Sequence, residues 1–67
     1  MTLPTHNTFI ISYLRGARRP WLINLVVDCF RTKREAVAEA TRLAKESLPS
    51  QLIVKGRDGQ VQRTQNY

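Results

Sequence analysis

The sequence predicts a single small α+β domain in which one helix packs on a small antiparallel sheet, with the element order β-β-α-β-β. Two segments rich in β-branched and aromatic residues precede an amphipathic helical segment, and an Asp-Gly turn between two further strand-like segments follows it. The chain has 67 residues, of which 42% are hydrophobic, so it can form one thin core. We expect a flexible lead-in at residues 1–8 and the domain at residues 9–67.

The first half of the domain is expected to form two strands joined by a basic loop. Residues 9–14 (FIISYL) and residues 21–30 (WLINLVVDCF) are rich in β-branched, aromatic and aliphatic side chains. Gly16 and Pro20 indicate a connection between them, because glycine supplies backbone freedom and proline cannot donate a ladder hydrogen bond. We therefore expect residues 15–20 to join the two strands.

Both faces of the second predicted strand, residues 21–30, are substantially apolar. Alternation places on one face the side chains of Trp21, Ile23, Leu25, Val27 and Cys29. The other face also carries apolar side chains, although a sheet covered by a single helix is expected to show one polar face. The excess predicts a homodimer that buries this strand. The alternative is a twisted strand with mixed, partly exposed faces.

The helix is predicted at residues 33–47. Thr32 is a favourable N-cap, and Glu35 completes a Thr-x-x-Glu capping box. Pro49 ends the element, because a proline biases the preceding residue away from helical geometry. The apolar face follows helical spacing and consists of Ala36, Val37, Ala40, Leu43 and Ala44.

The outer face of this helix is charged. Arg42 lies three residues after Glu39 and four before Glu46, so ordinary surface ion pairs are expected between them. Lys33 and Arg34, in contrast, occupy the positive end of the helix dipole. Their placement favours an anionic partner near the helix start.

The last third of the chain predicts a β-hairpin. Asp58 and Gly59 form a strong type I′ turn signal between residues 51–57 and residues 60–65. With these two residues as the turn, Lys55 is expected opposite Gln62 on a polar outer face. The same register predicts an apolar inner face made by Leu52, Val54 and Val61.

The segments FRTKREAVAEATRLAKES and LIVKGRDGQVQRTQNY, together with Trp21, resemble the small bacterial family called domain of unknown function 2188. That family has a Trp-bearing strand, a Phe-x-Thr-Lys-x-Glu-Ala helix start and a Gly-Arg-Asp-Gly hairpin. Lys55 stands where the family usually has His, and the interval from Trp21 to Phe30 is shorter than in the family. The resemblance implies a fold, and it implies no activity. Small variants of such families are common in bacteria and their phages, which is context for a bacterial or phage setting.

Motifs for catalysis and metal binding are missing from the sequence. There is no P-loop, no Gly-x-Gly-x-x-Gly and no Cys/His cluster, so we expect no enzyme, no cofactor and no metal. Cys29 is the only cysteine and His6 the only histidine, which excludes an internal disulfide and predicts a reduced compartment. Residues 1–7 have no apolar core of a signal peptide, and the apolar run at residues 21–27 is too short to cross a bilayer. We expect a cytoplasmic protein without a membrane partner.

The charge is strongly basic, with 11 Lys and Arg against 5 Asp and Glu and a formal net charge of +6. The basic residues gather in the first loop, at the helix start and on the final hairpin, and the predicted binding residues are Arg15, Arg18, Arg19, Arg31, Lys33, Arg34, Lys55, Arg57 and Arg63. Arginines and helix-start amides suit phosphate.

This grouping predicts a small binding module that contacts nucleic-acid phosphates. Tyr13, Trp21 and Tyr67 are considered for stacking on unpaired bases. Strand alternation favours Trp21 as a core residue instead, while Tyr67 is expected either as a lid on the sheet or as a disordered end. The alternative is a protein-interaction or inhibitor module, derived from a phage or mobile element, that binds an acidic protein. Such a module could also bind by strand addition at the free edge of the sheet. A solvated cationic surface without a dedicated ligand is the plainest interpretation.

Overall fold

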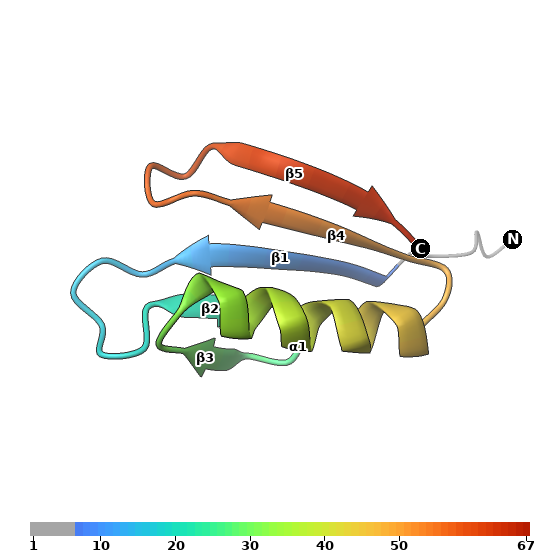
Figure 1. Cartoon of the computed structure of the whole chain (residues 1–67), viewed down its shortest axis with the longest axis horizontal. Helices are drawn as coiled ribbons and strands as arrows, with labels where there is room; N and C mark the ends of the chain where they lie inside the picture. Colours follow the sequence, from blue (N-terminus) through green and yellow to red (C-terminus); the bar gives the residue numbers. More distant parts are fainter. Residues whose placement is uncertain (1–6) are drawn as a thin grey trace, which may run out of the picture.

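The computed structural model describes residues 7–67, which form a five-stranded sheet with one helix lying across one face (Figure 1). This confirms the α+β class. The elements along the chain are β1 (Asn7–Tyr13), β2 (Trp21–Ile23), β3 (Asp28–Phe30), α1 (Lys33–Glu46), β4 (Ser50–Lys55) and β5 (Val61–Asn66). Across the sheet the strand order is β3-β2-β1-β4-β5. Asn7 and Thr8, predicted in the flexible lead-in, belong to β1, and the rest of that segment lies outside the described residues.

The sheet is mixed, and the prediction of an antiparallel sheet is wrong in its centre. β1 and β4 are parallel, with Phe9 opposite Leu52 and Ile11 opposite Val54, while the other three strand pairs are antiparallel. The physical reason is the path of α1. The helix carries the chain back along the sheet after β3, so that β4 starts at the same end as β1 and runs beside it in the same direction (Figure 1).

The predicted strand at residues 21–30 is two short strands joined by a turn. β2 and β3 pair with each other, with Trp21 opposite Phe30. Asn24 ends β2, because its side-chain Oδ1 accepts the N–H of Ile10 at 2.6 Å and the chain then turns away from β1. Val27 lies in this turn, 76% exposed and with φ of 51°, in the left-handed region that a β-branched residue rarely adopts. The apolar residues of the turn therefore belong to no strand face.

The β4–β5 hairpin differs from the predicted two-residue turn. Gly56 donates its N–H to the carbonyl of Gln60 at 2.9 Å, which leaves a three-residue loop that ends at Gly59 with φ of 84°. A β-bulge then shifts the ladder, so that Lys55 lies opposite Val61 and not opposite Gln62. Val61 consequently leaves the inner face and is 56% exposed.

Small side chains bring α1 close to the sheet. Ala36, Ala40 and Ala44 repeat every four residues and are fully buried. The helix starts as predicted, because the Thr32 hydroxyl accepts the N–H of Glu35 at 3.2 Å. The facing sheet residues of the core are Phe9, Ile11, Trp21, Ile23, Leu52 and Val54.

At the far end of the helix, Ser50 ties three elements together. Its buried hydroxyl donates to the Ala44 carbonyl at 2.6 Å, and its backbone N–H and C=O both pair with Tyr67. Since buried polar groups are costly unless bonded, these contacts stabilise the junction of α1, β4 and the C-terminal residue. They also fix Tyr67 against the core cluster.

Candidate functional site

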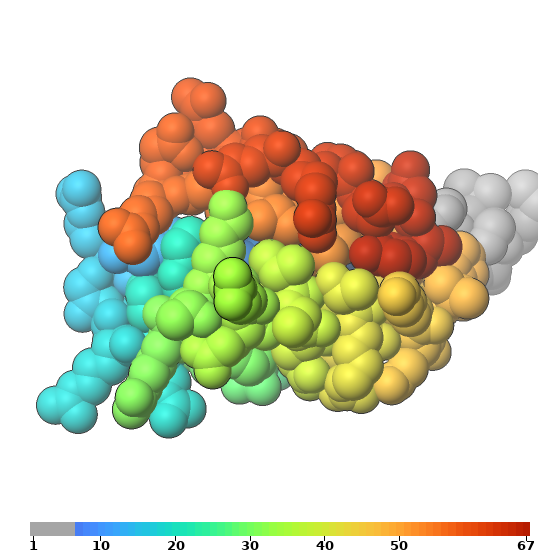
Figure 2. Space-filling view, in the orientation of Figure 1, coloured from blue at the N-terminus to red at the C-terminus, as the bar shows by residue number. Residues whose placement is uncertain are grey.

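The topology gathers most of the positive charge at one end of the molecule. β1, β3 and β4 finish at this end and α1 begins there, so the β1–β2 loop, the helix start and the β4–β5 turn lie together (Figure 1). Figure 2 shows long side chains from these three segments, coloured blue to cyan, green and orange, projecting at that end. We call this surface the basic end. It carries eight of the eleven Lys and Arg side chains, namely Arg15, Arg18, Arg19, Arg31, Lys33, Arg34, Lys55 and Arg57.

Arg63 is the predicted binding residue that lies apart from this surface. It is the third residue of β5, opposite Val54, and cross-strand partners share a face of the sheet. Lys55 lies on the other face, opposite Val61. A two-residue turn at Asp58 and Gly59 would pair Arg63 with Val54 as well, so Arg63 lies apart because of its place on β5 and not because of the bulge.

An open cleft of about 610 Å³ marks the centre of the basic end. The start of α1 and the β4–β5 turn form its two sides, and their arginines are Arg31 and Arg57. The lining residues are Trp21, Arg31, Thr32, Lys33, Gly56, Arg57, Asp58 and Gln62. A helix start carries partial positive charge from its free N–H groups, which adds to that of the arginines.

Two aromatic rings position the cationic side chains of the cleft. The Arg57 guanidinium lies 5.3 Å from the centre of the Tyr13 ring, and the Lys33 ammonium lies 6.0 Å from that of Trp21. The two rings pack edge to face at 5.0 Å. Such cation–π contacts contribute about 0.5–1 kcal/mol each at exposed sites. The rings therefore hold the cations at the cleft.

Gln62 and Gly56 complete the cleft. The sequence offered Gln62 as a contact on the outer face of the hairpin, whereas it gave no reason to expect Gly56 in a site. Lys33 donates a hydrogen bond from its ammonium to the side-chain oxygen of Gln62. A side chain at position 56 would place its Cβ 2.7 Å from the Gln62 amide nitrogen, so glycine is the residue that leaves Gln62 in place. The Gln62 position depends on the bulge, which the turn signal at Asp58 and Gly59 did not reveal.

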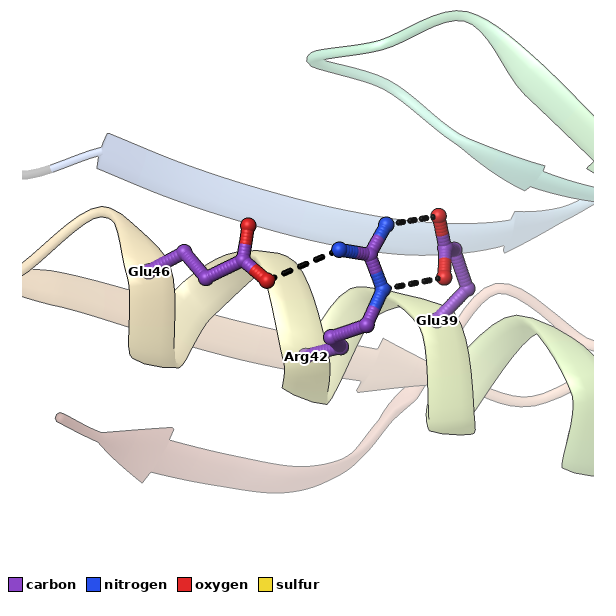
Figure 3. Close-up of polar contacts among 3 residues, drawn as sticks. All are labelled: Glu39, Arg42 and Glu46. Carbon is purple, nitrogen blue, oxygen red and sulfur yellow. Dashed lines mark hydrogen bonds and ion pairs between the residues drawn. The ribbon is translucent and has the colours of Figure 1, made fainter.

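Carboxylates do not neutralise the basic end. Within residues 7–67 the two ion pairs are those that Arg42 makes with Glu39 at 2.7 Å and with Glu46 at 2.8 Å, along the later turns of α1 (Figure 3). The hydrogen bonds from Arg42 hold the pKa of Glu39 below its ordinary value, and the same contacts raise the pKa of Arg42. Two of the five acidic residues are thus engaged away from the basic end.

The remaining three acidic residues lie near the basic end, where they accept hydrogen bonds from backbone N–H groups and from the hydroxyl of the helix N-cap. Asp58 accepts the N–H of Gln60 at 3.1 Å, and Asp28 accepts the N–H of Cys29 at 2.9 Å. Glu35 accepts the hydroxyl of the helix cap. Because these carboxylates serve the turns and the cap, no ion pair involves a cation of the basic end in the part of the chain that the structure describes.

A second, smaller cleft of about 470 Å³ lies beside the first. Its charges are mixed, since Arg19 and Arg31 line it together with Asp28 and Glu35. Cys29 lines this cleft and is half-buried and free. The mixed lining makes it a weaker anion site than the cleft at Arg57.

The described residues give no geometry for metal binding or for crossing a membrane. Between residues 7 and 67, no three His, Cys, Asp or Glu side chains come together in a cluster suited to a metal ion. In the same range, α1 with its 14 residues is too short and too polar to span a bilayer. His6 lies outside these residues.

A family model described as "Uncharacterized protein conserved in bacteria (DUF2188)" matches residues 27–67. The chain belongs to the DUF2188 family. The matched segment runs from the β2–β3 turn through α1, β4 and β5, and so includes both sides of the large cleft, whereas β1 and β2 precede it. No curated protein and no solved structure matches the chain.

Proposed function

We propose that this DUF2188 protein is a non-enzymatic module that binds nucleic acid through phosphate contacts at the basic end. One observation carries the proposal: eight cationic side chains converge on one end, and none of them is in an ion pair within residues 7–67. Unpaired arginines bind phosphate with charge-assisted, often bidentate hydrogen bonds. A surface of this kind favours phosphate along a polyanion over an isolated small ligand.

The proposal gives a definite salt dependence. Each phosphate that a cation neutralises makes the slope of log affinity against log salt more negative by about 0.9 for duplex DNA. If all eight cations made contact, the slope would reach about −7. We expect a smaller but still steep slope, because the eight side chains surround the end of the molecule and cannot all meet one ligand together.

Fluorescence anisotropy with a labelled 20-base-pair duplex tests this directly. The chain is expected to bind at 50 mM salt, with affinity falling steeply towards 200 mM. The triple variant Arg15→Gln, Arg18→Gln, Arg19→Gln should bind more weakly while keeping its circular dichroism, because the three side chains are exposed. Absence of binding by the unmodified chain at low salt would end the proposal. Equal competition by polyglutamate would instead favour an acidic protein as partner.

Self-association is a second candidate property, and the uncovered face of the sheet favours it. Ile10, Leu22 and Ile53 lie on the face away from α1, half-buried, with no other described element over them. Lys55 is the one charged side chain of the described strands on this face, so two copies could meet there without strong repulsion. Light scattering at high protein concentration distinguishes a 7.7 kDa monomer from a dimer of twice that mass.

A further inference from the structure

We propose that the nucleic acid bound at the basic end is double-stranded and is held by its phosphates without stacking of bases on aromatic rings. This inference rests on the proposed function and adds the class of ligand. Proteins that bind single strands without sequence preference combine a basic groove with aromatic side chains on which successive bases stack. The question is therefore whether this chain offers any such ring.

The core already uses the aromatic side chains. The chain has five Phe, Trp and Tyr residues, and all five lie within residues 7–67. Phe9 is 2% exposed and Trp21 is 5% exposed. The other three, Tyr13, Phe30 and Tyr67, pack against the core cluster. None of the five is among the exposed residues, so the prediction that Tyr13, Trp21 and Tyr67 stack on bases finds no support in their placement.

The rings nearest the cleft also have partners of their own. Arg57 covers Tyr13, and Lys33 lies above Trp21, which in turn packs against Tyr13. A base that stacked on Tyr13 would have to displace the guanidinium that makes the site basic. Tyr67 is held at the opposite end of the sheet by its backbone bonds to Ser50.

The free face of the sheet is equally unsuited to stacking. Sheets that bind single-stranded RNA display aromatic residues on their central strands. Here the corresponding face of β1, β2 and β4 carries the aliphatic residues Ile10, Leu22 and Ile53. The polar side chains beside them on this face, such as Ser12 and Gln51, can form hydrogen bonds, but no described aromatic ring lies there, so the face offers no stacking platform for a single strand.

Contact with phosphates remains as the source of affinity, and a duplex places more phosphates within reach of the basic end than a single strand does. Double-stranded DNA presents about one charge per 1.7 Å of its axis, counting both strands. The basic loop, the helix start and the hairpin turn come from three separate segments at one end. Such a surface can touch phosphates of both strands, whereas a flexible single strand without stacking must be ordered for fewer contacts.

The test compares three labelled 20-mers with the whole chain by anisotropy at 100 mM salt: a duplex, its single strand and an abasic strand with the same phosphates. We expect the duplex to bind at least tenfold more tightly than the single strand. We also expect the single strand and the abasic strand to bind within twofold of each other, because the bases contribute nothing.

Each result bears on a different statement. A single strand that binds as tightly as the duplex, or that loses affinity when its bases are removed, would overturn the inference while the proposed function stands. Failure of all three ligands to bind, even at 50 mM salt, would overturn the proposed function and the inference with it. The variant Tyr13→Leu adds a check, because a selective loss of single-strand binding would reveal stacking on that ring.

Discussion

Neutralising the two arginines of the large cleft should reduce the salt dependence of duplex binding by a defined amount. In the double variant Arg31→Gln, Arg57→Gln, two phosphate contacts are lost. The slope of log affinity against log salt should then become less negative by about 1.8, since each contact contributes about 0.9. Between 50 and 200 mM salt, the unmodified chain should lose about tenfold more affinity than the variant over the same range.

The structure indicates that this variant folds. Both arginines are exposed and neither forms an ion pair within residues 7–67. The stability cost should be close to the cation–π contact of Arg57 with Tyr13, about 0.5–1 kcal/mol. Thermal melting followed by circular dichroism checks the fold before binding is measured.

A matched control separates a site from bulk charge. The variant Lys45→Gln, Arg63→Gln also removes two positive charges, but from exposed positions on α1 and β5 outside the basic end. It should leave the slope close to that of the unmodified chain. If the two double variants change the slope equally, net charge and not the cleft drives binding, and the reasoning is refuted.

Three further predictions concern the fold. Val27→Gly should raise the free energy of unfolding by about 1 kcal/mol in urea denaturation, because it relieves a β-branched residue in the left-handed region; a loss of stability would contradict this. Ala40→Leu should lower that free energy by at least about 1–3 kcal/mol, because Ala40 is fully buried between α1 and the sheet. The Glu39 carboxyl should show a pKa below 4.5 when it is titrated by NMR, and this pKa should rise in Arg42→Gln. The pair's small stabilising effect is therefore present above pH 4.5 and lost as the pH falls through the lower folded pKa.

The sequence predicts local structure well where one short signal decides it. The cap at Thr32 and the alanine spacing place α1 within one residue of its observed end. The spacing of Arg42 from Glu39 and Glu46 likewise predicts the two observed ion pairs. These features depend on contacts within a few residues, so a single sequence contains them.

The errors arise where distant segments decide. The parallel pairing of β1 with β4 follows from the path of α1 across the sheet, and no local pattern reports it. The break after β2 depends on the bond between Asn24 and the backbone of Ile10. The bulge that moves Gln62 towards Lys33 is equally a matter of tertiary contact.

The candidate site shows the same division. The eight cations of the basic end could be predicted because they are grouped in three short segments of the sequence. Residues that are close together in one loop or at one helix start stay close together in the fold. Arg63 lies apart from the basic end because it stands within β5, opposite Val54. The contacts of Arg57 with Tyr13 and of Lys33 with Trp21 join residues far apart in the sequence, so no local pattern predicts them.

Amide chemical-shift mapping tests the central claim most directly. The 15N-labelled chain is titrated with the unlabelled 20-base-pair duplex at 50 mM salt. Shifts should concentrate in residues 15–19, 31–34 and 55–59, and the amides of residues 44–50 at the other end should stay unchanged. Shifts centred on Ile10, Leu22 and Ile53 of the free sheet face, or an unchanged spectrum, would contradict binding at the basic end.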